Sequence, residues 1–171
     1  VVDVEEIIED LEEESGLQPL EEADWPKQLM VDGPLFIEVI DDHLWVSANL
    51  QTAFRAPLTD ISQAVWRTFE LATVVSYDVK ALYHRLDATG IAVRFNEVHD
   101  LRQGAFLIDP LQRDRSYGGL IGSDSEDPLV ILAGSRNVYE QQVKQFDAEP
   151  KVKQIAYQYD FPLTYTLFKI E

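Results

Sequence analysis

The amino-acid sequence predicts an α/β domain in which one mixed β-sheet is covered by helices. Three short apolar runs separated by turn residues fall between residues 34 and 58, and a β-branched run at 72–77 is followed by helical patterns. Strands that give way to helices in this order are typical of a single sheet with helices packed on it. With 46% hydrophobic and 11% aromatic residues in 171, the chain can bury a core, which excludes an acidic disordered protein for most of its length.

The N-terminal part of the chain carries most of the net charge of −17. Residues 1–24 hold eleven carboxylates and neither lysine nor arginine, so the remainder carries only −6. Apolar residues recur there at helical spacing, as Val4, Ile7, Ile8 and Leu11. We expect an acidic helix and an irregular, proline-containing lead-in over residues 1–33, with the domain proper at 34–171. An acidic tail that docks a basic partner or mimics nucleic acid is the alternative interpretation.

The domain proper is expected to begin with a β-hairpin. LFIEVI at 35–40 and HLWVSA at 43–48 are separated by Asp41-Asp42, a pair suited to a tight turn. QTAFRAPL at 51–58 is expected to add a third strand. Thr59 or Asp60 would then cap a helix. Its expected apolar positions are Ile61, Val65, Phe69 and Leu71.

A buried strand and two helices are expected next. ATVVSY at 72–77 is β-branched, and Asp78 can cap a helix that Gly90 ends. The apolar positions of that helix are Val79, Leu82, Tyr83 and Leu86. Residues 91–95 lead into a further helix at about 99–109, which Asp109-Pro110 stops.

The last third of the chain is expected to be helical after a polar, glycine-rich loop at 111–128. Helices are predicted at about 131–147 and 151–171, the second interrupted at Pro162. The expected apolar face of the last helix consists of Ile155, Phe161, Leu163, Leu167 and Ile170.

Composition excludes several kinds of chemistry. The chain contains no cysteine, which removes disulfides, thiolate nucleophiles and zinc–thiolate sites. Its three histidines, His43, His84 and His99, lack the spacing of metal ligands. No apolar run of about eighteen residues and no charged-then-apolar leader is present, so neither a membrane partner nor secretion is expected. Carboxylate chemistry therefore remains the candidate.

Four aromatic residues have two possible roles. Trp45, Trp66, Tyr77 and Tyr83 could stack on nucleic-acid bases. Their apolar spacing within an α/β pattern favours a place in the core instead.

Several stretches resemble the 3'-5' exonuclease domain of bacterial family A DNA polymerases, the DNA polymerase I type. VVSYDVKALYHRLDATGI (74–91), followed by VHDLRQGAFLIDP (98–110), is similar to the family's second exonuclease motif region. IAYQYDFPLTYTLFKIE (155–171) resembles the helix that leads into the polymerase domain, and PLFIEVI (34–40) falls where the first exonuclease strand belongs. The resemblance covers residues 34–171 and implies a ribonuclease-H-like mixed sheet with flanking helices.

The resemblance also implies that metal ligands have been lost. Sites of this family hold two divalent metal ions and need several converging carboxylates. Glu38 stands at the first aspartate position, but its i+2 partner is Ile40. Leu82 stands at the aspartate position of the second motif, and Asn137 lies near that of the third. Apolar side chains cannot ligate a metal and asparagine carries no negative charge, so we expect no catalytic residue, cofactor or metal in this domain.

The function implied by the resemblance is structural. The chain would be an inactive, vestigial 3'-5' exonuclease domain of a DNA-directed DNA polymerase I that acts in DNA replication and repair. The expected partners are a covalently linked polymerase domain that uses Mg²⁺, a 5' nuclease domain where one is present, and DNA bound through the parent enzyme. A location in the bacterial cytoplasm, at the nucleoid, follows from this interpretation.

Two alternatives stay open. One is an active metal-dependent 3'-5' exonuclease with rearranged carboxylates, namely Glu38, Asp42, Asp78 and Asp100. The other is an acidic scaffold that docks a basic partner through residues 1–24.

Overall fold

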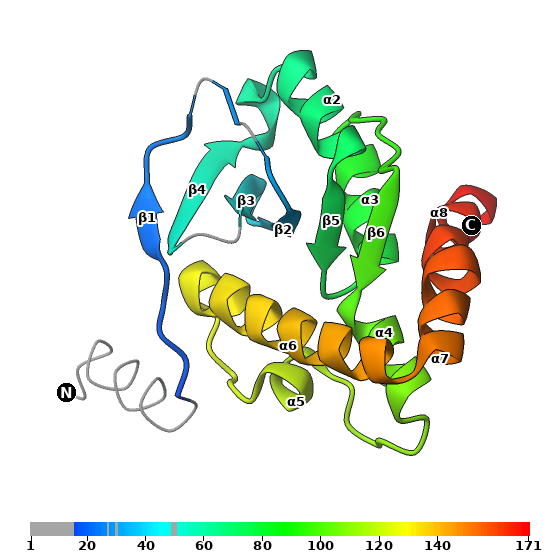
Figure 1. Ribbon diagram of the computed structural model, residues 1–171. Helices are drawn as coiled ribbons and strands as arrows, with labels where there is room; N and C mark the ends of the chain where they lie inside the picture. Colours follow the sequence, from blue (N-terminus) through cyan, green and yellow to red (C-terminus); the bar gives the residue numbers. More distant parts are fainter. Residues whose placement is uncertain (1–15, 27, 30, 49–50) are drawn as a thin grey trace.

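The computed structural model describes residues 16–26, 28–29, 31–48 and 51–171 (Figure 1). The strands are β1 (Glu21–Ala23), β2 (Pro34–Ile40), β3 (His43–Ser47), β4 (Thr52–Pro57), β5 (Thr73–Ser76) and β6 (Glu97–Asp100). The helices are α2 (Gln63–Leu71), α3 (Val79–Ala88), α4 (Leu101–Ile108), α5 (Tyr117–Ile121), α6 (Pro128–Ala148), α7 (Pro150–Ile155) and α8 (Phe161–Ile170), with a 3-10 helix at Leu58–Asp60 and a π-helix at Ala156–Asp160. The apolar positions of the acidic helix expected near the N-terminus, Val4 to Leu11, fall outside the described residues.

The strands form one mixed sheet in the order β1-β4-β3-β2-β5-β6. β2, β3 and β4 are antiparallel neighbours, while β5 and β6 continue the sheet parallel to β2. β2 and β3 are joined by Asp41 and Asp42, whose φ angles are 49° and 60°. Two successive positive φ angles define the tight hairpin turn that matches the twist of the strands. The predicted α/β class and its mixed sheet are confirmed.

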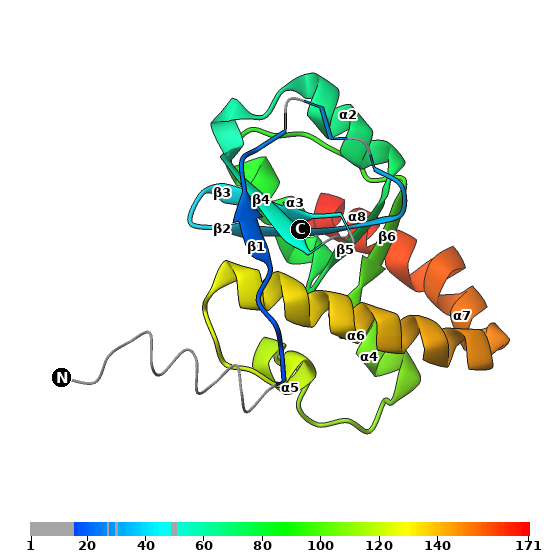
Figure 2. The same ribbon diagram turned by 60° about the vertical axis from the view of Figure 1, so that its left-hand side comes forward.

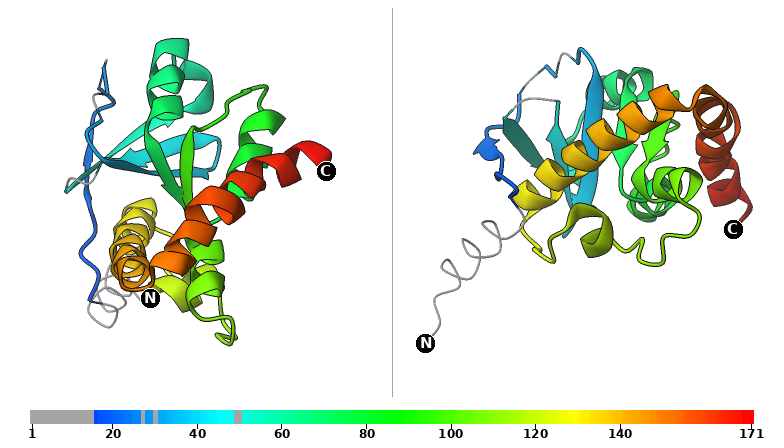
Figure 3. Two further views of the ribbon diagram at one scale, coloured as in Figure 1. Left: turned by 45° about the vertical axis from the view of Figure 1, so that its right-hand side comes forward. Right: turned by 60° about the horizontal axis from the view of Figure 1, so that its bottom comes forward.

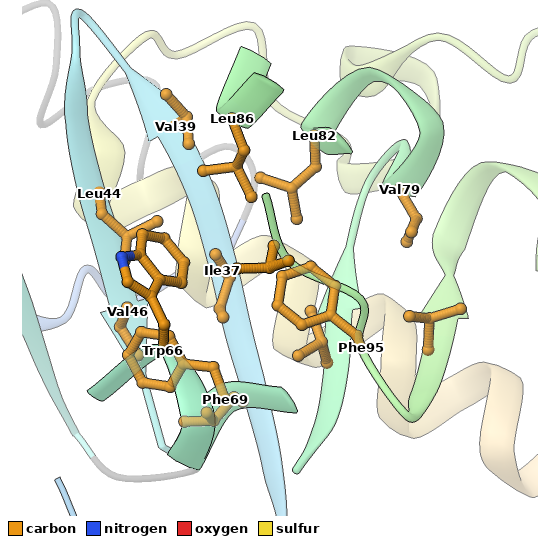
Figure 4. Close-up of a cluster of buried hydrophobic side chains, with 14 of the residues drawn as sticks. Ile37, Val39, Leu44, Val46, Trp66, Phe69, Val79, Leu82, Leu86 and Phe95 are labelled. Atoms are coloured by element: carbon orange, nitrogen blue, oxygen red, sulfur yellow. The ribbon is translucent and has the colours of Figure 1, made fainter. Parts of the chain in front are cut away.

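Helices cover both faces of the sheet, with α2 on one side and α6 on the other (Figures 2 and 3). The larger apolar cluster contains Ile37 and Val39 of β2 and side chains of α2 and α3. Figure 4 shows it, with Trp66 and Phe69 on one helix and Leu82 and Leu86 on the other. The smaller cluster joins Phe36 of β2 to α6. Alternate residues of β2 therefore supply the two cores.

Two strands, one short helix and one cap differ from the sequence prediction. The helix is α5, which lies within the loop expected at 111–128. β1 lies within the expected irregular lead-in, where it pairs with β4 as a short edge strand, and β6 occupies what was expected to be the start of a helix. The cap of α2 is Ser62, whose Oγ accepts a hydrogen bond from the Val65 N–H at 3.4 Å. Thr59 and Asp60 form the 3-10 helix instead. The division of the chain at residue 34 stays a prediction. No helix among the described residues is long and apolar enough to cross a membrane.

Gly134 lets α6 approach α5 closely. A Cβ atom at this position would overlap Cγ2 of Ile121, a buried side chain of α5. Gly134→Ala should therefore lower the free energy of unfolding by about 2 kcal/mol, although alanine favours a helix by about 1 kcal/mol. Urea unfolding followed by circular dichroism measures this change.

Gly118→Ala is the matched control for this substitution. The atom that a Cβ would meet there belongs to Asp124, whose exposed side chain can rotate away. The control should change the free energy of unfolding by less than about 0.5 kcal/mol. Equal effects of the two variants would show that the contact between Gly134 and Ile121 does not limit packing.

Candidate functional site

Carboxyl groups gather where the parallel strands β2, β5 and β6 end. Glu38 lies on β2, Asp78 stands two residues after the end of β5, and Asp100 is the last residue of β6. In the register of the parallel strands β5 and β6, Ser76 pairs with Asp100. This edge of an open α/β sheet is the usual place for a binding or catalytic site.

Glu38 is a buried carboxyl group, with 8% of its surface exposed. Its Oε1 accepts hydrogen bonds from the Tyr77 N–H at 2.9 Å and from Ser76 Oγ at 3.1 Å. Burial raises the pKa of Glu38 to about 7, against the lowering effect of these bonds and of Arg85. The negative charge of Asp100 adds to the rise. Glu38 therefore exchanges a proton near neutral pH.

Asp100 joins the starts of two helices. Its Oδ1 accepts a hydrogen bond from the Gln103 N–H and its Oδ2 one from the Val79 N–H, each at 2.8 Å. It is 4% exposed, and burial raises its pKa to about 6. Both carboxylate oxygens thus satisfy backbone groups that the first turns of helices leave unpaired.

Asp78 caps α3, as the sequence predicted. Its Oδ1 accepts a hydrogen bond from the Ala81 N–H at 2.9 Å. Its Oδ2 lies 3.1 Å from Nη1 of Arg102, an exposed arginine at the start of α4. The acidic side chains at this edge of the sheet therefore hold helix starts in place.

The candidate positions are divided between two clefts and the core. Glu38, Ile40 and Asp42 line a cleft of about 840 Å³, which Arg85 also borders. Asp78 and Asp100 line a second cleft of about 370 Å³. The four carboxylates proposed as a rearranged metal cluster are thus not gathered in one cavity. Within the described ranges, no three or more His, Asp or Glu side chains could hold one metal ion together.

Leu82 and Asn137 line neither of these clefts. Leu82 is 2% exposed and belongs to the larger core cluster, whereas Ile40 packs against the smaller one. Asn137 is half-buried on α6. The structure therefore places the two apolar positions on opposite sides of the sheet.

Aromatic residues of the prediction fall mainly in the core. Trp45, Trp66 and Tyr83 are 6%, 3% and 2% exposed, so the core interpretation is confirmed for these three. Tyr77 is half-buried, packs edge-on against Tyr117 at 5.3 Å between ring centres, and lines the larger cleft with it. The Tyr77 hydroxyl donates to the Arg115 carbonyl at 2.7 Å.

A buried polar network next to this site was not predicted. His99 of β6 is fully buried, with Nε2 at 2.8 Å from Gln142 Oε1 and Nδ1 at 2.6 Å from the Tyr157 hydroxyl. Gln142 donates from Nε2 to the Leu101 carbonyl at 2.8 Å. Its Oε1 is therefore the atom that faces His99, so Nε2 of the imidazole carries the proton and Nδ1 accepts from Tyr157. Burial lowers the pKa of His99 to about 4, which keeps it neutral.

Fold and site together define an α/β domain whose strand-end carboxyl groups bind the backbone amides of helix starts. A solved structure with the same fold is the POL domain of Pol1 from M. smegmatis in complex with DNA primer-template and dNTP. The TM-score is 0.65 at 13% sequence identity, and the match covers 99% of this chain but 31% of that one. No protein-family model and no curated protein matches the sequence.

Proposed function

We propose that this chain is a structural module of a DNA polymerase I enzyme, an exonuclease-like domain of ribonuclease-H-like fold whose 3'-5' nuclease site has decayed. One observation carries the proposal: at the strand ends, the acids Asp78 and Asp100 cap helices while the ligand position beside Glu38 is filled by Ile40. The mixed sheet and the fold shared with the Pol1 chain support the choice of family.

The chemistry of the remaining side chains favours a structural role. Two metal ions need several carboxylates with free oxygens pointing at one place. Both oxygens of Asp100 and Oε1 of Glu38 instead accept hydrogen bonds from the chain itself, and Leu82 fills the apolar core. Replacing ligand carboxylates by apolar groups removes like-charge repulsion from a site that binds no metal, which stabilises the fold.

The proposal assigns DNA contact and catalysis to the rest of the parent enzyme. A covalently linked polymerase domain would bind Mg²⁺ and the DNA, and a 5' nuclease domain would precede this module where one is present. The net charge of −17 agrees with this division of labour, because an acidic surface repels phosphates. The parent enzyme would act in replication and repair in the bacterial cytoplasm.

A nuclease assay tests the loss of activity. Purified 1–171, incubated with end-labelled single-stranded DNA and Mg²⁺, should digest no more DNA than buffer does. Glu38→Ala and Asp78→Ala are run beside it to identify a contaminating nuclease, which they would leave unchanged. Mg²⁺-dependent digestion that either substitution abolishes would overturn the proposal.

A rearranged active site is the second candidate. It is favoured by the raised pKa values of Glu38 and Asp100, each of which lines one of the two clefts, because perturbed carboxyl groups in clefts are typical of catalytic sites. Crystals soaked in Mn²⁺ separate the two proposals. Two ions bound by members of the set Glu38, Asp42, Asp78 and Asp100 would establish a nuclease site, whereas the structural proposal expects none of these carboxylates to bind an ion.

A further inference from the structure

Glu38 keeps one carboxylate oxygen without a hydrogen-bond donor among the described residues. The bonds that its side chain accepts from Tyr77 and Ser76 both end on Oε1, and none reaches Oε2. The side chain is 8% exposed and lines the cleft of about 840 Å³. Oε2 is not sealed from solvent, so the cleft gives access to it. Because buried polar atoms are normally paired, this free oxygen is open to a donor on a ligand.

The cleft lies at the end of β2, between helices that cover the two faces of the sheet. Arg85 of α3 lines it from one face, and Tyr117 of α5 and Ile131 of α6 line it from the other. Asp41 and Asp42 form the hairpin turn after β2, and both are exposed residues of the same lining. The acidic groups of the cleft thus extend from a buried carboxylate to exposed carboxylates at the turn.

The side-chain donors of the cleft are largely used within the chain. The hydroxyl groups of Tyr77, Tyr117 and Thr89 each donate to a backbone carbonyl, at 2.7, 2.9 and 2.8 Å. Arg85 donates from Nη1 to the Val39 carbonyl at 3.0 Å. The side chains of the lining therefore offer mainly acceptor oxygens, which a ligand with N–H donors satisfies.

The charges of the lining favour an elongated cation. When ionised, Glu38, Asp41 and Asp42 carry three negative charges against the one positive charge of Arg85, so phosphates and other anions are repelled. The three carboxylates do not converge, since no group of acids or histidines in the described ranges could hold one metal ion. Glu38 and Asp41 are three residues apart, which is about 10 Å along a strand. Two separated positive charges fit this arrangement better than one compact metal ion does.

Aliphatic side chains form the walls of the cleft. Val39, Ile40, Leu58 and Ile131 contribute hydrocarbon surface to its lining. A chain of methylene groups gains free energy when such walls remove it from water. An aliphatic diamine combines a methylene chain with an ammonium group at each end.

We propose that the cleft beside Glu38 binds an aliphatic polyamine, with one ammonium group on Oε2 of Glu38 and a second at the Asp41-Asp42 turn. The pKa of Glu38 is about 7 because burial outweighs the attraction of Arg85. A bound ammonium group supplies the positive charge that the ionised carboxylate lacks. The site does not depend on the enzyme to which the domain belongs.

Calorimetric titration of the 171-residue chain with 1,4-diaminobutane at pH 8 tests the site. We expect saturable binding of one diamine. Glu38→Gln should weaken this binding at least about tenfold, because a charged hydrogen bond is lost. Glu140→Gln is the matched control, since Glu140 is an exposed acid of α6 that lies outside the cleft lining. It removes the same charge from the chain and should leave the affinity unchanged.

Butylamine separates the elongated site from a single ion pair. It has the same four-carbon chain but one ammonium group, so it should bind at least about fivefold more weakly than the diamine. Equal affinities of the two amines would overturn the inference. Equal weakening by Glu38→Gln and Glu140→Gln would indicate general attraction to an acidic chain, and this result or the absence of saturable binding would also overturn it. Each of these failures leaves the nuclease assay, and with it the proposed function, unaffected.

Discussion

His99→Ala is expected to lower the free energy of unfolding by about 4 kcal/mol at pH 7. The substitution leaves a cavity among the rings of Tyr139, Phe146, Tyr157 and Phe161, whose centres lie 4.8–5.8 Å from that of the imidazole. It also leaves the Tyr157 hydroxyl and Gln142 Oε1 without their partner inside the fold. Guanidinium unfolding at constant pH measures the loss, with His43→Ala as the control.

The pH dependence of this loss identifies the buried imidazole as its cause. The pKa of His99 is about 4 in the folded chain and 6.5 without burial, so the unfolded state binds more protons between these values. Stability contributed by neutral His99 is therefore lost as the pH falls through this window, by about 3 kcal/mol in total. The difference between the two proteins should shrink to about 1 kcal/mol at pH 4. A difference that stays constant with pH would refute the assignment of a neutral, buried histidine.

His43→Ala should change the free energy of unfolding by less than about 0.5 kcal/mol, because surface substitutions have small effects. Its ring bonds to the Asp41 carbonyl in the exposed hairpin turn. If His43→Ala lowered the free energy of unfolding as much as His99→Ala does, the loss in His99→Ala could not be assigned to the buried hydrogen-bond network.

The sequence predicted the elements that are specified by interactions between residues close together in the chain. The β2–β3 hairpin, β4, β5 and α3 all follow from apolar runs, turn residues and the cap Asp78. β6 was missed because its sequence, Glu-Val-His-Asp, buries two polar side chains. Apart from the local bond from the Gln103 N–H to Asp100, their hydrogen bonds join them to α3, α6 and the π-helix, far away in the chain. No local pattern reports partners that only the tertiary fold supplies.

The candidate site and the last helix also depend on tertiary contacts that the sequence pattern does not report. The sequence singled out Glu38 and Asp100, but only the fold reveals that their oxygens bond to Tyr77, Val79 and Gln103. The predicted apolar face of the last helix was correct in composition, yet of its members only Phe161 is buried. Periodicity finds an apolar face, but in a helix that is apolar on both sides it does not choose which face meets the core.

Glu38→Gln is expected to stabilise the domain at pH 8 by about 3 kcal/mol. The pKa of Glu38 is about 7 in the folded chain and 4.5 when unburied, so between these values the folded state binds more protons. The natural sequence therefore loses stability as the pH rises through this window. Glutamine keeps an oxygen that can accept from Tyr77 and Ser76 but carries no charge to desolvate. At pH 4 the two proteins should differ little.

Thermal unfolding with and without Mg²⁺ turns this substitution into a test of the site. If Glu38 only accepts internal hydrogen bonds, millimolar Mg²⁺ should not raise the melting temperature of the natural sequence at pH 8. A metal ligand behaves differently, because an ion that binds only the folded state stabilises it by mass action. A rise in melting temperature that Glu38→Gln abolishes, and that the exposed variant Glu140→Gln retains, would restore the nuclease interpretation. If Glu38→Gln stabilises the domain at pH 8 and Mg²⁺ does not raise the melting temperature of the natural sequence, the Glu38 carboxylate destabilises the fold and binds no metal ion. This is the result expected of a decayed site.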